Sequence, residues 1–171
     1  MPILLPRPMN KCVRVVDDDA AVRQAMKRVL EGAGYQVRLA QDGDEAAAQF
    51  LPEQTDLLLL DLNLPCQSGW DVFERLTSRC PVVPVIIITG RPDQLPTAVA
   101  AGVSALMEKP IEPTRLLQTI GEVLAEPGET RLRRMCGYRA GLRLVPPRNR
   151  PELQRHREAA PQPHRRRRPH R

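Results

Sequence analysis

The chain alternates short apolar runs with segments of helical periodicity, and this alternation constrains its fold more than any other feature of the sequence. The first run, Cys12 to Val16, is mostly β-branched and stops at three consecutive aspartates. The following segment, Ala20 to Leu30, carries its apolar residues on one helical face, and Gly32 and Gly34 come directly after it. This pattern predicts a buried strand followed by an amphipathic helix.

The same unit recurs along the chain. Further strands are expected at Tyr35–Leu39, Leu57–Leu60, Val82–Ile88 and Val103–Met107. Further helices are expected at Glu45–Leu51, Trp70–Ser78, Thr97–Ala101 and Pro113–Ala125. Near-continuous apolar strands separated by helices indicate a parallel sheet that is covered on both faces. The predicted fold class is therefore α/β, a doubly wound five-stranded parallel sheet with helices on both faces.

The charges divide the chain into two unlike parts. Residues 1–126 hold 12 Lys and Arg against 17 Asp and Glu, whereas residues 127–171 hold 14 arginines, no lysine, 3 glutamates and 7 prolines. A segment that is so rich in Arg and Pro has too little apolar periodicity to build a core. We therefore expect an N-terminal extension over 1–10, one globular domain over 11–126, and a disordered basic tail over 127–171.

Several classes of protein are excluded by the composition. No apolar run approaches the roughly 18 to 20 residues that span a bilayer, and prolines interrupt the first residues where a secretory signal would lie. The cysteines are scattered without a Cys-x-x-Cys pair, which is typical of reduced thiols rather than of disulfides or a zinc site. We expect a protein without a membrane span that is located in the cytoplasm.

Polar side chains gather where the predicted strands end. Asp17 and Asp18 follow the first strand, Asp61 the third, Thr89 the fourth and Lys109 the fifth. Doubly wound folds bind ligands outside the carboxyl ends of their strands. Three converging carboxylates would repel one another unless a cation neutralised them, and hard oxygen ligands favour Mg²⁺.

These residue types also suit phosphoryl transfer. A threonine hydroxyl and a lysine ammonium, added to a bound metal ion, would surround a phosphoryl group with donors and positive charge. An aspartate oxygen can form an acyl phosphate without first losing a proton. Asp61 stands alone after the central strand and is the best-placed nucleophile.

Each of these residues alone has a simpler explanation. An aspartate after a strand often only caps the next helix, a threonine can complete a strand end, and a lysine can lie in solvent. Their joint occurrence in order at strand ends, together with Pro65, Gly69 and Pro110, favours one common site.

The chain resembles a known family, the receiver domains of two-component response regulators. The resemblance extends from Cys12 to about Ala125 and implies a CheY-like, flavodoxin-like sheet with the strand order 2-1-3-4-5. It rests on four motifs, Val15-Val16-Asp17-Asp18-Asp19, Leu60-Asp61-Leu62-Asn63-Leu64-Pro65 with Ser68-Gly69, Ile88-Thr89-Gly90 and Glu108-Lys109-Pro110.

The resemblance implies a set of metal ligands. Asp18, Asp61 and the backbone carbonyl of Asn63 would bind Mg²⁺, and Asp17 would act through a water molecule.

The resemblance also implies the reaction. Asp61 would accept a phosphoryl group from a sensor histidine kinase or a phosphotransfer protein, with Thr89 and Lys109 in contact with that group. The Lys109-Pro110 bond would be cis, which an X-Pro bond permits at small cost. Such a domain promotes only its own phosphorylation and dephosphorylation, so we do not expect an enzyme in the ordinary sense. The acyl phosphate would switch partner binding, with a homodimer as one possible output.

Two features depart from the family. The position three residues before the lysine commonly carries Tyr or Phe, and here it is Leu106. Pro92 and Pro96 leave room for only a short fourth helix before Gly102. The change at Leu106 leaves open a second function, an interaction module that works without phosphorylation.

The basic tail leaves a third function open. Its 45 Pro- and Arg-rich residues cannot supply the three packed helices of a DNA-binding output domain. The arginines could still hold nucleic acid or an acidic partner without sequence specificity, under control of the globular domain. The alternative is a solvated or incidental extension.

Overall fold

The computed structural model describes residues 10–136 and 142–147. A six-stranded sheet, with every pairing parallel, runs through its centre in the order β2-β1-β3-β4-β5-β6. The strands are β1 (Cys12–Val16), β2 (Gln36–Ala40), β3 (Leu57–Asp61), β4 (Val85–Thr89), β5 (Ala105–Glu108) and β6 (Arg143–Val145). The doubly wound class and the order 2-1-3-4-5 are confirmed. The expected count of five strands is wrong, because β6 extends the sheet beyond β5.

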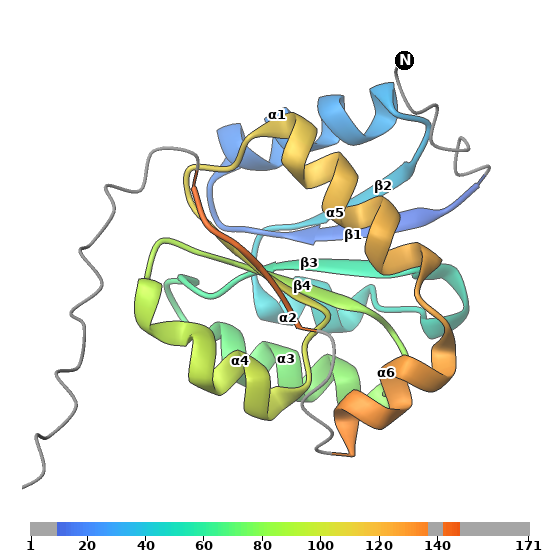
Figure 1. Ribbon diagram of the computed structural model, residues 1–171. Coiled ribbons are helices and arrows are strands. Elements are labelled where there is room, and N and C mark those ends of the chain that lie inside the picture. Colours follow the sequence, from blue (N-terminus) through green and yellow to red (C-terminus); the bar gives the residue numbers. More distant parts are fainter. Residues whose placement is uncertain (1–9, 137–141, 148–171) are drawn as a thin grey trace, which may run out of the picture.

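Helices cover both faces of this sheet, with α1 and α5 on one face and α2, α3 and α4 on the other (Figure 1). The helices are α1 (Ala20–Gly32), α2 (Gly43–Ala48), α3 (Gly69–Arg79), α4 (Leu95–Ala101), α5 (Pro113–Ala125) and α6 (Gly128–Met135). Two 3₁₀ turns, η1 (Pro52–Gln54) and η2 (Pro92–Gln94), precede β3 and α4. The fourth helix is short, as expected.

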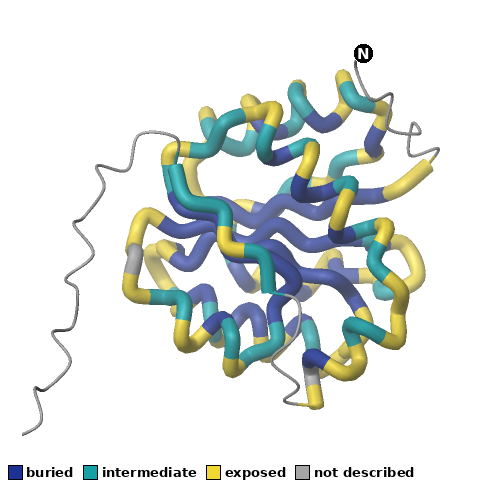
Figure 2. The backbone as a smooth tube through the Cα atoms, in the orientation of Figure 1, coloured by how far each residue is buried: buried dark blue, intermediate teal, exposed yellow. Residues whose placement is uncertain are grey.

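The core lies on the two faces of the central strands. Every residue of β1, β3 and β4 is buried, and Figure 2 shows these strands as the dark blue centre of the molecule. Successive side chains of a strand point to opposite faces, so Leu58 and Leu60 join the apolar cluster beneath α2, α3 and α4, whereas Leu57 and Leu59 join the one beneath α1 and α5. Burial on both faces explains why these strands are nearly continuous apolar runs, apart from Arg14 within β1 and the polar residues Asp61 and Thr89 at the ends of β3 and β4.

The fourth strand begins later than the sequence predicts. β4 starts at Val85 rather than Val82, which is 48% exposed. Pro84 lies directly before the strand and contributes only its carbonyl, which accepts a hydrogen bond from the N–H of Leu58. A proline has no N–H to give to a ladder and is tolerated at the start of a strand, so the ladder begins after it.

The expectation of a disordered tail is wrong for two segments that the structure describes. Residues 128–135 form α6 and residues 143–145 form β6. The remainder of the tail, 137–141 and 148–171, and the extension over 1–9 lie outside the described residues, so the expectations for them stay predictions. In the part of the chain that the structure describes, no helix is both long enough and apolar enough to cross a membrane.

Candidate functional site at the carboxyl ends of the strands

Three carboxylates meet at the carboxyl edge of the sheet. β1 and β3 are parallel neighbours with Val16 opposite Leu60, so Asp17 and Asp61 follow in adjacent positions. One carboxylate oxygen from each of Asp17, Asp18 and Asp61 lies within 4.8 Å of the other two. Asp17 and Asp61 are buried, whereas Asp18 is exposed. The predicted acidic cluster is therefore present.

Asp19 differs from the two aspartates before it. Its carboxylate accepts hydrogen bonds from the N–H groups of Ala21 and Val22 and so caps the first turn of α1. Helix capping, the simpler explanation for the aspartate triplet, therefore applies to Asp19. Asp17 uses Oδ1 to accept the N–H of Asp19 at 2.8 Å, and this bond orients its carboxylate within the cluster.

The Asp61 carboxylate is held at both oxygens. Oδ1 accepts the backbone N–H of Asn63 at 2.9 Å, and Oδ2 accepts a hydrogen from Lys109 Nζ at 2.6 Å. Lys109 Nζ also lies 3.5 Å from Oδ2 of Asp17. The Lys109-Pro110 peptide bond is cis, as predicted. The site thus joins residues from β1, β3 and the segment after β5.

Burial and nearby opposite charges shift the pKa values of this site in opposite directions. Burial raises the pKa of Asp17, although the nearby Lys109 ammonium partly offsets it. Burial alone would lower the pKa of Lys109, but the hydrogen bond to Asp61 and the charges of both aspartates outweigh it and raise that pKa. One ammonium faces three carboxylates, so a net negative charge remains.

The donor set fits a divalent metal ion. The clustered groups offer hard carboxylate oxygens, which suit Mg²⁺, and no soft sulfur ligand belongs to the cluster among the described residues. A divalent cation would also offset the repulsion that Lys109 alone leaves uncompensated. Asp17, Asp18 and Asp61 can therefore hold the ion that the sequence analysis expected.

Thr89 lies at the same edge, as the last residue of β4. Its side chain is fully buried, and Oγ1 accepts the backbone N–H of Arg91 at 3.0 Å. Its carbonyl accepts the N–H of Lys109 at 2.8 Å, which ties the end of β4 to the lysine. Contact of Thr89 with a phosphoryl group and coordination by the Asn63 carbonyl stay predictions.

Two supporting residues have roles that the sequence analysis did not identify. Arg23 on α1 donates from Nη1 to the backbone carbonyl of Asp17 at 2.7 Å and so fixes the start of the acidic loop. A Cβ at Gly69 would lie 2.5 Å from the Cα of Leu62 and 2.7 Å from the carbonyl oxygen of Asp61. Gly69 is thus a steric requirement of the loop after Asp61. Arg23 reads in sequence as an ordinary polar-face residue, while Gly69 was noted only as part of a motif.

The structure also places Leu106 and Trp70, two residues that lie near the site. Leu106 is fully buried in β5, in the apolar cluster beneath α2, α3 and α4. Trp70 donates from Nε1 to Gln94 Oε1 at 2.9 Å and packs edge-to-face on Phe73 with ring centroids 5.7 Å apart. The indole therefore links α3 to the segment that follows β4, close to the ends of β3 and β4.

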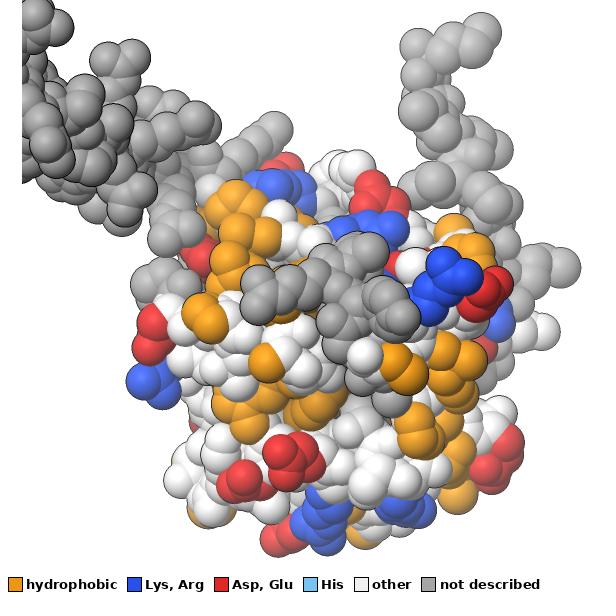
Figure 3. All heavy atoms as spheres, turned by 60° about the horizontal axis from the view of Figure 1, so that its bottom comes forward, with side chains coloured by type: hydrophobic (Ala, Val, Ile, Leu, Met, Phe, Trp, Pro, Cys, Tyr) orange, Lys and Arg blue, Asp and Glu red, His pale blue; other side chains and the backbone are white. Residues whose placement is uncertain are grey.

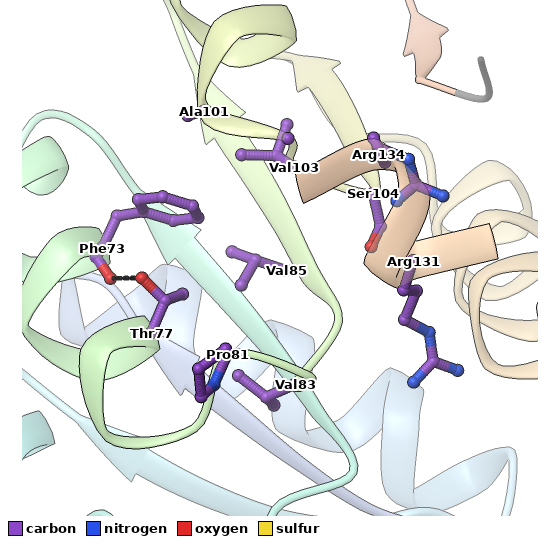
Figure 4. Close-up of a pocket in the computed structure, with 11 residues that line it drawn as sticks. Phe73, Thr77, Pro81, Val83, Val85, Ala101, Val103, Ser104, Arg131 and Arg134 are labelled. Carbon is purple, nitrogen blue, oxygen red and sulfur yellow. Dashed lines mark hydrogen bonds between the residues drawn. The ribbon is translucent and has the colours of Figure 1, made fainter. Parts of the chain in front are cut away.

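A small hollow under α6 is not a second site of this kind. It has a volume of about 60 Å³, with apolar walls that include Phe73, Val85 and Val103, and Figure 4 shows Arg131 and Arg134 on its α6 side. Arg134 pairs with Glu126, and Arg131 donates to backbone carbonyls. Both guanidinium groups are used to hold α6 against the domain.

Comparisons with known proteins show the family of this chain. A family model for the response regulator receiver domain matches residues 13–121. Response regulator MprA from Mycobacterium bovis is 35% identical over 119 residues, which cover 68% of this chain and 51% of that protein. This chain therefore spans about half the length of the curated relatives it matches.

Solved structures share the fold. A CheY-like receiver domain protein from Methanospirillum hungatei superimposes with a TM-score of 0.63 at 30% identity, over 70% of this chain and 97% of that one. TrrA from Thermotoga maritima, solved in complex with Mg(2+)-BeF, superimposes with a TM-score of 0.61 at 24% identity, over 66% of this chain and 98% of that one.

Proposed function

The chain belongs to the family of response regulator receiver domains, and on this premise we propose that Asp61 accepts a phosphoryl group with Mg²⁺ bound beside it. The observation that carries the proposal is the environment of Asp61. Its buried carboxylate lies between Lys109 Nζ and the N–H of Asn63, and it shares one cluster with two further carboxylates. Phosphorylatable aspartates and magnesium binding are general features of this family.

The roles of the residues follow from their chemistry. Asp18, Asp61 and the backbone carbonyl of Asn63 would hold Mg²⁺, with Asp17 acting through water, and the ion would neutralise charge on the incoming phosphoryl group. An Asp61 oxygen would form the acyl phosphate as the bond between phosphorus and the histidine nitrogen of the donor breaks and leaves the imidazole free. This step needs no general base, because a carboxylate already carries the required lone pair.

Two hydrogen-bond donors would contact the phosphoryl group. The Lys109 ammonium and the Thr89 hydroxyl are groups that can hydrogen-bond to phosphoryl oxygens. Forming the acyl phosphate changes the partners of Lys109, which in this structure are Asp61 and Asp17. Such a domain is not a classical enzyme, because it modifies itself and turns over no separate substrate.

The phosphodonor we propose is a sensor histidine kinase or a phosphotransfer protein. An open apolar hollow with a volume of about 570 Å³ lies beside Lys109, between α1 and the start of α5. Its apolar walls include Val22, Met26, Ile111 and Leu116. An exposed apolar surface of this kind next to the proposed phosphoacceptor supports a protein donor.

Other outputs are kept as predictions. An interaction module that works without phosphorylation draws support from the buried Leu106, but retention of all three carboxylates and Lys109 favours phosphorylation. Nucleic-acid binding through the tail, homodimer formation and a cytoplasmic location also stay predictions. On the face shown in Figure 3, basic and acidic side chains are interspersed, which does not resemble a continuous basic patch.

The test is intact-mass analysis after incubation with acetyl phosphate, in Mg²⁺ and in EDTA. Wild type should gain one phosphoryl group only with Mg²⁺, and Asp61→Asn should gain none. Asp56→Asn is a matched control, because Asp56 directly precedes the same strand at its other end and should not affect labelling.

The outcomes discriminate between the functions. Labelling of Asp61→Asn to the wild-type level would show that another residue accepts the phosphoryl group. If folded wild type binds Mg²⁺ but is labelled neither by acetyl phosphate nor by phosphorylated histidine kinases, the module that works without phosphorylation becomes the better assignment.

A further inference from the structure

The outer edge of β5 is covered by a strand from the basic tail. β6 pairs in parallel with β5, with Ala105 opposite Arg143, Leu106 opposite Leu144 and Met107 opposite Val145. It is the orange-red strand that lies along β5 in Figure 1. The residues between α6 and β6 number fewer than ten, so the pairing is a return of the chain onto its own sheet.

Side chains on both faces of β6 contact the domain. Arg143 and Val145 lie on the α5 side, where Arg143 Nε is 3.1 Å from Glu122 Oε2 and Val145 packs against the apolar cluster beneath α1 and α5. Leu142 packs against the cluster on the opposite face, and Leu144 is 41% exposed. Successive side chains of this segment therefore point to opposite faces of the sheet, as in any β-strand, and both faces contact the domain.

The end of the segment also contacts the domain. Arg115 of α5 donates from Nη1 to the carbonyl of Pro146. Pro146 and Pro147 have no N–H group, so they end the ladder and discourage a further strand from pairing there. Residues 142–147, which we call the edge segment, are thus recognised through their backbone, two apolar side chains and one arginine.

Without the edge segment, β5 would be an exposed edge. All four of its residues are buried, and three of them are apolar. Such a strand presents unpaired backbone groups and readily accepts another strand. β6 itself is only three residues long, and its ion pair is partly exposed, with 33% of the Arg143 side chain and 45% of the Glu122 side chain accessible. A short strand with few buried contacts opens at low cost.

We propose that the edge of β5 is a strand-binding surface, occupied in this structure by the chain's own edge segment, and that it binds the edge segment of a second copy when its own is released. The second copy is the occupant that fits, because an exchanged segment repeats every contact of the one seen here. The surface is distinct from the phosphoacceptor site, and the proposal does not depend on phosphorylation.

The test uses the full chain and a fluorescein-labelled peptide with the sequence of residues 137–150. Val145→Asp places a carboxylate against the apolar cluster and should release the edge segment. Leu144→Asp is the matched control, because this neighbour is more exposed and its substitution should leave the segment in place. By fluorescence anisotropy, Val145→Asp should bind the peptide at least tenfold more tightly than wild type or Leu144→Asp.

The ion pair between Arg143 and Glu122 gives a second, independent readout. A peptide with Arg143→Glu should bind Val145→Asp more weakly, and Glu122→Arg added to that chain should restore binding of this peptide. Amide hydrogen exchange of β5 checks that the edge has opened in the Val145→Asp chain. The proposal is wrong if the β5 amides remain protected, if they open but no peptide binds, or if wild type binds the peptide equally well.

Discussion

Two ion-paired clusters among the described residues have opposite charge imbalances. At the carboxyl edge, three carboxylates cluster, and one ammonium, Lys109 Nζ, pairs with two of them, at 2.6 Å from Asp61 and 3.5 Å from Asp17. At the junction of α5 and α6, the Glu126 carboxylate pairs with the guanidinium groups of Arg134 and Arg131. The first cluster can take up a divalent cation, whereas the second has no use for one. The sign of the imbalance therefore separates a ligand site from a structural contact.

The largest effect is expected when the ammonium is removed from the acidic cluster. Lys109→Met leaves the buried carboxylates of Asp17 and Asp61 without their cation, which should lower the free energy of unfolding by about 3 kcal/mol in EDTA. Mg²⁺ should recover part of this loss, because it supplies the missing positive charge. Urea unfolding followed by circular dichroism measures both effects.

Lys11→Met is the control for that experiment. Lys11 pairs with Asp56 at 2.7 Å, but half of its side chain is exposed. This variant should change stability little and should show no additional response to Mg²⁺. If Lys109→Met is as stable as wild type in EDTA, the ammonium does not offset the buried carboxylates.

A smaller loss is expected at the α5–α6 junction. Glu126→Gln leaves the buried Arg134 guanidinium without its carboxylate, at a cost of about 2 kcal/mol. The cost is limited because α6 can detach and bring Arg134 into water. Hydrogen exchange should show lost protection in α6 while β3 keeps its own. Stabilisation by Mg²⁺ beyond that of wild type would contradict the comparison of the two clusters.

Removing one carboxylate from the acidic cluster should stabilise the protein. Asp17→Asn should raise the free energy of unfolding by about 1 kcal/mol at pH 7 in EDTA, because burial makes the charged Asp17 unfavourable. The same variant should bind Mg²⁺ more weakly, as followed by Trp70 fluorescence. A variant that is less stable than wild type in EDTA would show that Asp17 is not a source of repulsion.

The gain from Asp17→Asn should depend on pH. The pKa of Asp17 is raised in the folded state, so the folded protein binds this proton more tightly than the unfolded chain does. Wild type therefore gains stability as the pH falls through the folded pKa. The advantage of Asp17→Asn should shrink over that range and vanish below the ordinary value of 3.8. Unfolding in urea at several pH values measures this difference.

The smallest effect belongs to an exposed pair on α6. Glu129 Oε1 lies 2.7 Å from Arg133 Nη2, but about 70% of both side chains is accessible. Glu129→Gln should cost about 0.3 kcal/mol at low salt, and the effect should disappear in 1 M NaCl. Glu126→Gln removes a buried ion pair at the same junction, so the difference between the two costs gives the effect of burial on the strength of an ion pair. A cost equal to that of Glu126→Gln would remove burial as the explanation.

The acidic cluster was predictable from sequence because its residues follow strands that are buried on both faces. Such strands form nearly continuous apolar runs, and parallel pairing places the residues after them at one edge. Asp17 and Asp61 are neighbours for this reason, and Lys109 follows a third run of the same kind. Family resemblance added the strand order. Residue type alone could not say which aspartate of the triplet caps α1. The family resemblance selected Asp17 and Asp18 for the site, and the structure shows that Asp19 is the cap.

The tail was misjudged because its ordered elements do not depend on a large apolar face. α6 is held by the buried Arg134 and by backbone acceptors of Arg131, and its Leu132 is 49% exposed. A search for apolar periodicity does not find such a helix. β6 (Arg143–Val145) is a short strand that two prolines follow. Its pattern was not identified because it lies within an Arg- and Pro-rich segment.

The parallel direction of β6 has a practical consequence for fluorescent reporters. Pro147 shares a hollow with Glu108 and Pro110, so a reporter protein fused directly after it would be attached beside the acidic edge of the sheet. A reporter fused before Asn10 would be attached at the opposite end of the sheet, where β1 begins. The first position suits a sensor whose signal should change when the acidic edge is occupied. The second suits a tag that must leave that edge accessible to a phosphodonor.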